Sequence, residues 1–233
     1  MLDPDPDKKL LSDRKALFSS RRRKIRSVPV VRAMERVPRE EFVPARDRPR
    51  AYRDEPFSIG EDQTISQPYI VALITEALRL QLRDWVLELG TGSGYQAAVL
   101  AELVPDGNVV TVELVPSLAQ QARATLAGLG YGNIVVEEST GSLGCPRLGP
   151  YDAIVVSAAA PTLSPTLLSQ LALGGRLVVP VGSRDQQELV CALRTGEGIS
   201  LRMLGPLPGR TTDPTRRFPR FTVSAGPSQN ALA

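Results

Sequence analysis

Residues 85–95 read Trp-Val-Leu-Glu-Leu-Gly-Thr-Gly-Ser-Gly-Tyr, an apolar stretch that runs into a loop with three glycines. Residues 85–89 predict a buried strand, and residues 95–103 after the loop predict a helix. Glycines let the backbone turn sharply and let a ligand approach closely. The helix N-terminus adds free N–H groups and the positive end of its dipole, which suits a carboxylate or phosphate. A glycine loop in this context predicts a ligand site.

The same alternation of strands and helices continues downstream. Helices are predicted over 116–129 and 165–173, the second stopped by Gly174-Gly175, and strands over 108–112, 133–136, 151–156, 176–181, 188–193 and 199–204. Most of these strands are apolar on both faces, which indicates helices on each side of the sheet. The predicted fold is α/β: a Rossmann-like, doubly wound, mostly parallel sheet. In such sheets ligands bind outside the carboxyl ends of the strands.

Composition divides the chain into four parts. Residues 1–12 carry prolines and alternating aspartates and predict a disordered lead. Residues 13–80 predict N-terminal helices and substrate-side loops, and the long loop-rich stretch 38–68 within them is typical of functional segments. Residues 81–205 form the predicted core. Residues 206–233 are rich in Pro, Thr, Ser, Gly and Arg and predict an irregular tail.

The composition also excludes several function classes. The 233 residues contain no histidine, so histidine-dependent hydrolases, phosphotransfer and zinc sites are excluded. Cys145 and Cys191 cannot form a CxxC pair or a four-cysteine metal site, so we expect no metal. The net charge of +3 argues only weakly for nucleic acid. Neither a signal peptide nor an apolar run of about 18–20 residues is evident, so we expect a cytoplasmic protein without a membrane span.

The glycine spacing separates two classes of ligand. A dinucleotide fingerprint requires GxGxxG, whereas residues 90–94 give GxGxG and Tyr95 takes the position of the last glycine. Glu88 precedes the loop, and Glu113 ends the second strand, where a carboxylate can accept hydrogen bonds from both ribose hydroxyls. This pattern resembles class I methyltransferases that use S-adenosylmethionine. A structural turn with chance glycines and a nicotinamide enzyme are the alternatives.

Further segments narrow the resemblance. They are Val37-Pro-Arg-Glu-Glu-Phe-Val-Pro44, Ala51-Tyr-Arg-Asp54, Ile59-Gly-Glu-Asp-Gln-Thr-Ile-Ser-Gln-Pro-Tyr-Ile-Val-Ala72, Leu87 to Ala101, Tyr151 to Pro161 and Gly174 to Gly182. Over residues 25–205 the chain resembles protein-L-isoaspartate O-methyltransferases. The resemblance implies methyl transfer from S-adenosylmethionine, with S-adenosylhomocysteine as product, to the free carboxylate of isoaspartyl residues in damaged peptides and proteins. It implies a repair enzyme, which we expect to be a monomer.

The resemblance also implies the site residues. The catalytic serine is Ser66, in Thr-Ile-Ser-Gln-Pro. Cofactor-binding residues are Glu88, Gly90, Thr91, Gly92, Ser93, Gly94, Glu113, Thr140 and Gly141, and weaker substrate-binding candidates are Gln63, Thr64, Ala159, Ala160 and Pro161. The implied chemistry needs no histidine, because a carboxylate is already ionised at pH 7 and attacks an electrophilic sulfonium donor. The neutral hydroxyl of Ser66 can orient that carboxylate without a full counter-charge.

Two departures from the family pattern leave alternatives open. Thr140 stands where the family usually has the aspartate that meets the adenine amino group, and losing a charge-assisted bond would cost about 1–2 kcal/mol. Leu204-Gly-Pro-Leu207 replaces a Phe/Tyr-Val-Pro-Leu segment, which predicts a divergent homologue, a frameshifted terminus or a tail ordered on binding. The alternatives are another peptide carboxylate as substrate, an RNA site contacted by the basic cluster 21–24, or a catalytically impaired homologue.

Overall fold

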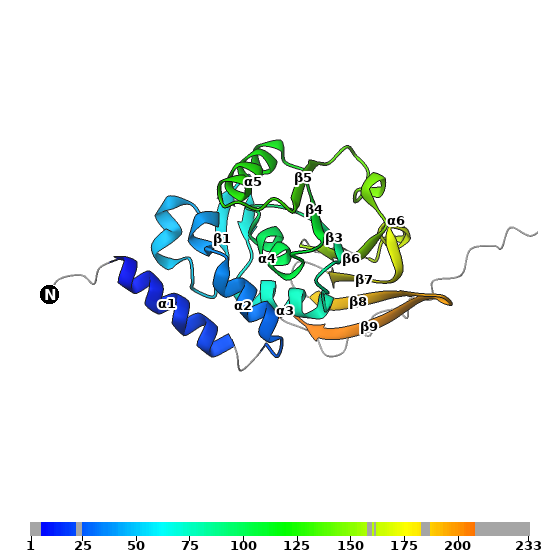
Figure 1. The fold of residues 1–233 in the computed structure, drawn as a ribbon, viewed down its shortest axis with the longest axis horizontal. Coiled ribbons are helices and arrows are strands. Elements are labelled where there is room, and N and C mark those ends of the chain that lie inside the picture. The colour runs from blue at the N-terminus through cyan, green and yellow to red at the C-terminus, as the bar shows by residue number, and fades with distance from the viewer. Residues whose placement is uncertain (1–5, 22–24, 158–159, 161, 183–186, 208–233) are drawn as a thin grey trace, which may run out of the picture.

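The chain alternates helices and strands around a seven-stranded sheet (Figure 1). The computed structural model describes residues 6–21, 25–157, 160, 162–182 and 187–207. The elements are α1 (Pro6–Arg21), α2 (Val28–Arg36), η1 (Arg39–Phe42), η2 (Ala45–Arg50), β1 (Phe57–Gly60), β2 (Gln63–Ile65), α3 (Pro68–Leu78), β3 (Trp85–Leu89), α4 (Tyr95–Leu103), β4 (Asn108–Glu113), α5 (Pro116–Gly128), β5 (Ile134–Glu138), η3 (Pro146–Leu148), β6 (Tyr151–Val156), α6 (Pro165–Ser169), β7 (Leu171–Gly182), β8 (Gln187–Thr195) and β9 (Gly198–Pro206).

The predicted doubly wound, mostly parallel sheet is confirmed. Its strand order is β5-β4-β3-β6-β7-β8-β9, with β3 to β7 parallel to one another and β8 and β9 antiparallel. The order reverses beside β3, because the chain moves outward to β4 and β5 and then returns to β6 on the other side. Loops that leave β3 and β6 in opposite directions open a crevice at this reversal, where ligands bind in open α/β sheets.

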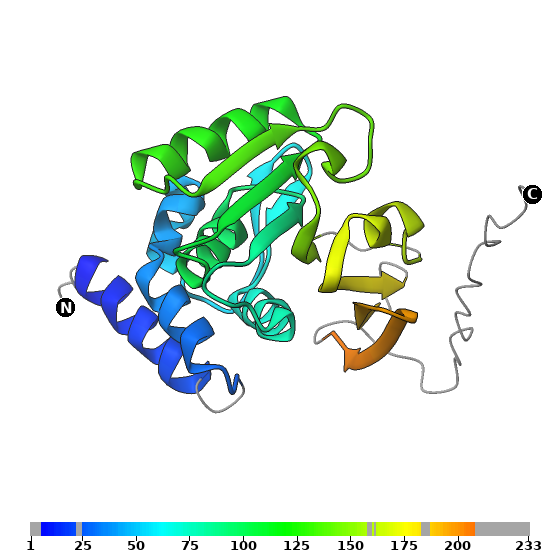
Figure 2. The same cartoon turned by 45° about the vertical axis from the view of Figure 1, so that its right-hand side comes forward.

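Alternate residues of the central strands fill two apolar cores, one on each face of the sheet. Val86 and Val155 belong to the core that α2, α3 and α4 cover, whereas Leu87 and Val156 belong to the core beneath α6. Because successive side chains of a strand point to opposite faces, each strand must be apolar throughout to fill both cores. Figure 2 shows α1 and α2 at one side of the molecule and α6 at the other.

The N-terminal extension packs against the first core. Leu17 and Phe18 of α1 are buried, and the ring of Phe18 meets Tyr52 edge to face with centroids 6.2 Å apart. Residues 6–12 of the predicted disordered lead are helical, because α1 already begins at Pro6, and residues 1–5 lie outside the described residues. Proline suits the first turn of a helix, so Pro6 begins the helix where its composition suggested disorder.

Three further predictions differ from the structure. The loop-rich stretch 38–68 contains η1, η2 and a β1–β2 hairpin, each too short for a clear periodicity. The helix predicted over 165–173 ends at Ser169, and Gly174-Gly175 lies inside β7 at an irregularity of its pairing with β6. A Cβ at Gly175 would lie 2.8 Å from the carbonyl oxygen of Tyr151, so this glycine permits a close approach of strands. Beyond residue 207, the predicted tail lies outside the described residues, as do residues 22–24 of the basic cluster.

Candidate active site

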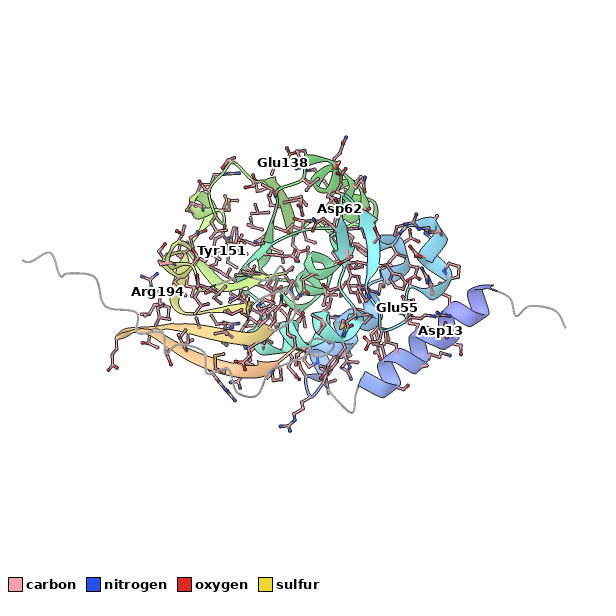
Figure 3. The ribbon with its side chains drawn as sticks, turned by 180° about the vertical axis from the view of Figure 1, so that it is seen from behind. Asp13, Glu55, Asp62, Glu138, Tyr151 and Arg194 are labelled. Carbon is pink, nitrogen blue, oxygen red and sulfur yellow. The ribbon has the colours of Figure 1, made fainter. Side chains whose placement is uncertain are left out.

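A cavity of about 390 Å³ opens at the carboxyl ends of the parallel strands. Most of its wall comes from four segments that are distant in sequence: the β1–β2 hairpin with Ser66, the glycine loop after β3, the end of β4, and the loop after β5. Ser157 after β6 and residues of α3 and α4 complete the lining. Figure 3 shows Asp62, at the hairpin turn, and Glu138, at the end of β5, on the same upper side of the molecule. The cavity thus joins the glycine loop to the segment that carries Ser66.

Left-handed backbone at all three glycines shapes the loop. Gly90, Gly92 and Gly94 have φ angles of +92°, +53° and +89°. Gly94 has a second constraint, because a Cβ there would lie 3.2 Å from Cδ1 of Leu126 on α5. Gly90, Thr91, Gly92 and Ser93 line the cavity, whereas Gly94 lies behind it as the last residue before α4. The third glycine is therefore required by packing.

Glu113 ties the glycine loop to the end of β4. Its Oε2 accepts a hydrogen bond of 2.7 Å from the backbone N–H of Gly92, and its Oε1 accepts from Leu114 and Val115 at 2.8 and 3.0 Å. A carboxylate offers about four acceptor positions, so these three bonds leave little of its capacity for ribose hydroxyls. Glu113 lines the cavity and is 6% exposed. The main structural role of Glu113 is therefore to hold the backbone N–H groups of Gly92, Leu114 and Val115, and only part of its carboxylate is left to accept a hydrogen bond from a ligand.

Glu88 lies beneath the cavity rather than in its wall. Its side chain is fully buried, and its two carboxyl oxygens accept hydrogen bonds from the hydroxyls of Thr111 at 2.7 Å and Ser157 at 3.3 Å. The hydroxyls of Thr111 and Thr91 are also 2.7 Å apart, which extends the chain into the glycine loop. Burial raises the pKa of Glu88 to about 8, and the nearby charge of Glu113 adds to the rise. Glu88 does not line the cavity itself, but its hydrogen bonds connect it to two residues that do, to Ser157 directly and to Thr91 through Thr111.

The β1–β2 hairpin covers the glycine loop. Gln63, Thr64 and Ser66 all line the cavity, and a Cβ at Gly92 would lie 3.4 Å from Cδ1 of Ile59 on the hairpin. The hydroxyl of Ser117, in the first turn of α5, donates a 2.9 Å hydrogen bond to Glu61 at the hairpin turn. Within the described part of the chain, the hydroxyl of Ser66 makes no hydrogen bond, so it is available to a ligand.

Apolar side chains form another part of the wall. Leu114 is 78% exposed directly after β4, and Leu143 is 46% exposed in the loop after β5. Exposed leucines at a cavity suit a flat, weakly polar ring such as adenine. Thr140 and Gly141 do not line the cavity, although Ser139, Ser142 and Gly144 of the same loop do.

A second cavity of about 450 Å³, largely apolar, adjoins the first and shares Leu89, Gly90 and Leu143 with it. Ala160 lines this second cavity and pairs with Val181, its N–H bonding to the carbonyl of Pro180 at 2.9 Å. Ala159 and Pro161 lie outside the described residues. Ala160 therefore lines a different cavity from Gln63, Thr64 and Ser66, and the two cavities share part of their lining.

The described ranges, 6–21, 25–157, 160, 162–182 and 187–207, offer neither a membrane-spanning helix nor a metal cluster. Their helices include none with the length and apolar character needed to cross a membrane. Within those ranges, no group of three or more Cys, Asp and Glu side chains is placed to hold a metal ion.

Residues 12–204 match the family model of protein-L-isoaspartate(D-aspartate) O-methyltransferases. The chain belongs to this family. The protein-L-isoaspartate O-methyltransferase of a Synechococcus strain is 50% identical over 204 residues, which cover 84% of this chain and 83% of the relative. The relative of the same name from Ignicoccus hospitalis is 48% identical, over 78% of this chain and 88% of its own length.

Two solved structures resemble this chain in fold. A protein-L-isoaspartate O-methyltransferase structure superimposes with a TM-score of 0.74 at 29% identity, covering 86% of this chain and 66% of that one. A crystal structure of a Plasmodium falciparum protein in complex with S-adenosyl-L-homocysteine has a TM-score of 0.71 at 24% identity, covering 83% of this chain and 94% of that one. The second likeness supports the fold alone.

Sequence reasoning missed several polar residues of the site. Ser157 follows β6 at its carboxyl end, a position that the strand-end rule singles out. Thr111 is the polar residue of an otherwise apolar stretch of β4, and its burial indicates a hydrogen-bonded role. Tyr95 and Ser139 also line the cavity without having been predicted to do so. The burial of Arg39 had no sequence signal at all, because it lies in a stretch rich in charged residues.

Proposed function

We propose that the protein is a protein-L-isoaspartate O-methyltransferase that methylates the free carboxylate of isoaspartyl residues. A single observation carries the proposal: one cavity joins the loop formed by Gly90, Thr91, Gly92 and Ser93 to Glu113 and to the free hydroxyl of Ser66. The first part suits an adenosyl donor, and the second suits a carboxylate acceptor. The family and the relatives described above support the same reaction.

The residues of the cavity fit S-adenosylmethionine. In this proposal the backbone of the glycine loop and Glu113 hold its ribose and amino-acid parts, and Leu114 and Leu143 flank its adenine. When bound, the donor supplies a methyl group on a positively charged sulfur. From the loop after β5, Ser139 and Ser142 line the cavity, whereas the predicted cofactor residues Thr140 and Gly141 lie outside its lining.

Ser66 orients the acceptor. Its hydroxyl donates a hydrogen bond to one oxygen of the isoaspartyl carboxylate, which directs the other oxygen toward the methyl carbon. The carboxylate is ionised at pH 7, so no residue has to remove a proton. Holding the two reactants in line accounts for the catalysis, since orientation alone can lower a barrier by several kcal/mol. Gln63 and Thr64 flank the acceptor, and Ala160 lines the adjoining cavity.

The family and Ser66 together favour a peptide substrate over RNA. Cys145 and Cys191 are both free thiols, which fits a reducing compartment such as the cytoplasm. We propose that the enzyme acts there as a monomer, and light scattering of the purified chain at assay concentration measures that state.

The test uses labelled S-adenosylmethionine and two peptides that differ only in an isoaspartyl or aspartyl linkage. We expect base-labile methyl ester on the isoaspartyl peptide alone. A structured RNA serves as a third acceptor. Transfer to RNA, equal transfer to both peptides, or cofactor binding without transfer would each contradict the proposal.

A further inference from the structure

Arg39 is the largest fully buried side chain of the described structure, with 0% of its surface exposed. It begins η1, near the start of the stretch predicted to be loop. Arginine is almost never fully buried unless its charge is paired. A buried guanidinium at this position therefore requires an explanation.

The guanidinium joins two loops and a helix. Its Nε donates a 2.8 Å hydrogen bond to the backbone carbonyl of Ala51, and its Nη2 donates a 2.7 Å bond to the carbonyl of Ser66. Its central carbon lies 4.6 Å from the centre of the Tyr95 ring, over the first residue of α4. Ser66 is thus fixed through its backbone while its hydroxyl stays free.

Within the described ranges, no carboxylate lies within ion-pair distance of Arg39. Asp54 interacts with it only at longer range, and Asp54 accepts a 3.0 Å hydrogen bond from the N–H of Tyr69. The Nη1 atom of Arg39 and the hydroxyl of Tyr95 are both buried without hydrogen-bond partners in this part of the chain. Because arginine keeps its charge in proteins, a positive charge without a close counter-ion lies directly behind Ser66.

We propose that Arg39 is the positioning residue of the acceptor site: its fork fixes Ser66, and its buried charge attracts the carboxylate that Ser66 orients. This inference rests on the proposed function. Lysine at this position would keep the charge but lose the planar fork, whereas methionine would lose both. The two substitutions therefore separate two effects. The positioning of Ser66 by the guanidinium acts on kcat, and the attraction of the substrate carboxylate by the positive charge acts on KM.

The first test measures kinetics of Arg39→Lys and Arg39→Met with an isoaspartyl peptide. Rates are divided by the number of sites that bind S-adenosylhomocysteine in calorimetry, which corrects for unfolded protein. Arg39→Met should lower kcat about 100-fold, as expected for a displaced reactant, and raise KM. Arg39→Lys should lower kcat while KM changes less than about threefold.

Arg176→Met is the matched control. Arg176 is also largely buried, bonds to the backbone carbonyls of Leu78 and Arg79, and pairs with Asp84. It lies at the opposite, amino-terminal edge of the parallel strands. We expect this variant to lower the melting temperature but to leave kcat and KM per binding site unchanged.

A second test does not depend on turnover. Ser66→Cys places a thiol at the site, and its alkylation is followed against pH by peptide mapping, with Arg39 intact or replaced. Removing the buried charge of Arg39 should move the pH midpoint of alkylation of this thiol upward by about one pH unit. Buried Cys145 must stay unreactive, which confirms that the protein remains folded.

The outcomes are distinguishable. If the unmodified protein methylates no isoaspartyl peptide, the proposed function fails. The pH dependence of alkylation in Ser66→Cys still measures the effect of the Arg39 charge in that case. If Arg39→Met does not fold, Cys145 becomes reactive and Arg39→Lys decides through its kcat. Kinetic constants per site within about threefold of the unmodified protein, together with an unchanged alkylation midpoint, would overturn the inference.

Discussion

The backbone N–H of Gly92 donates a 2.7 Å hydrogen bond to Oε2 of Glu113, which joins the glycine loop to the end of the neighbouring strand β4. Two more N–H groups, from Leu114 and Val115, bond to the other carboxyl oxygen. One side chain thereby fixes backbone on both sides of the candidate cofactor site. These three hydrogen bonds explain why the protein needs an acidic residue at the end of β4 to hold the backbone of the site even before any ligand binds.

Replacing Glu113 with glutamine should therefore weaken cofactor binding and lower stability together. The amide NH₂ cannot accept a hydrogen bond, so at least one N–H loses its partner at a cost of about 1–3 kcal/mol. Calorimetry with S-adenosylhomocysteine should show at least about a tenfold loss of affinity. Glu138→Gln is the control. The side chain of Glu138 is half exposed, and its ion pair with Arg123 is long, with 3.7 Å between the nitrogen and oxygen atoms. Equal effects of the two substitutions would contradict the assignment.

Glu88 should make stability depend on pH. Its pKa in the folded protein is raised to about 8, above the usual value near 4.5, chiefly by burial. Between these values the folded state holds a proton that the unfolded state has lost, so the free energy of unfolding falls as pH rises. The contribution is complete below about pH 4.5 and is lost above about pH 8.

Denaturation of Glu88→Gln at several pH values checks this prediction. Glutamine resembles the protonated acid, so we expect stability near pH 5 to change by no more than about 1 kcal/mol. The decline in stability toward pH 8 should become shallower than in the unmodified protein. An identical pH dependence in both proteins would show that Glu88 is ionised when folded.

Gly94→Ala should be more destabilising than Gly130→Ala. Both residues have left-handed backbone, with φ of +89° and +83°, which costs a non-glycine residue about 1–2 kcal/mol. Only Gly94 faces a neighbour, since its Cβ would lie 3.2 Å from Leu126, whereas the space around Gly130 is open. Chemical denaturation of the two variants measures the packing contribution as a difference. Equal losses would show that Leu126 moves aside.

Ser66→Ala should reduce turnover without affecting cofactor binding. A hydrogen bond to a charged group contributes about 1.5–3 kcal/mol, so we expect kcat to fall about 10- to 150-fold. The affinity for S-adenosylhomocysteine should stay the same. Ser58→Ala is the control on the same hairpin, because Ser58 is exposed and makes only a 3.5 Å bond to the N–H of Gly60. Full activity of Ser66→Ala would remove the serine from the mechanism.

The sequence by itself determined the sheet, the glycine loop and the acidic residue at the end of β4. These features depend on the local periodicity of apolar residues and on the residue types that directly follow a strand, and both can be read from residues that are neighbours in the sequence. The segment motifs around Ser66 also predicted a role for it at the acceptor side, and the structure places it in the wall of the cavity. By contrast, the start of α1 at Pro6 was mispredicted, because α1 packs against η2 and α2 through contacts that its local composition does not reveal. Gly174-Gly175 was mispredicted as the end of a helix, because pairing with β6 includes it in β7.

Only the tertiary structure decided what each charged side chain touches. Glu88 and Glu113 look alike in the sequence, yet one lies fully buried against hydroxyls and the other caps three backbone N–H groups. Arg39 is one of several arginines between residues 32 and 53, and only folding removes it from water and aims it at the carbonyl of Ser66. Burial and pairing are set by segments far apart in the chain, and no local pattern encodes them.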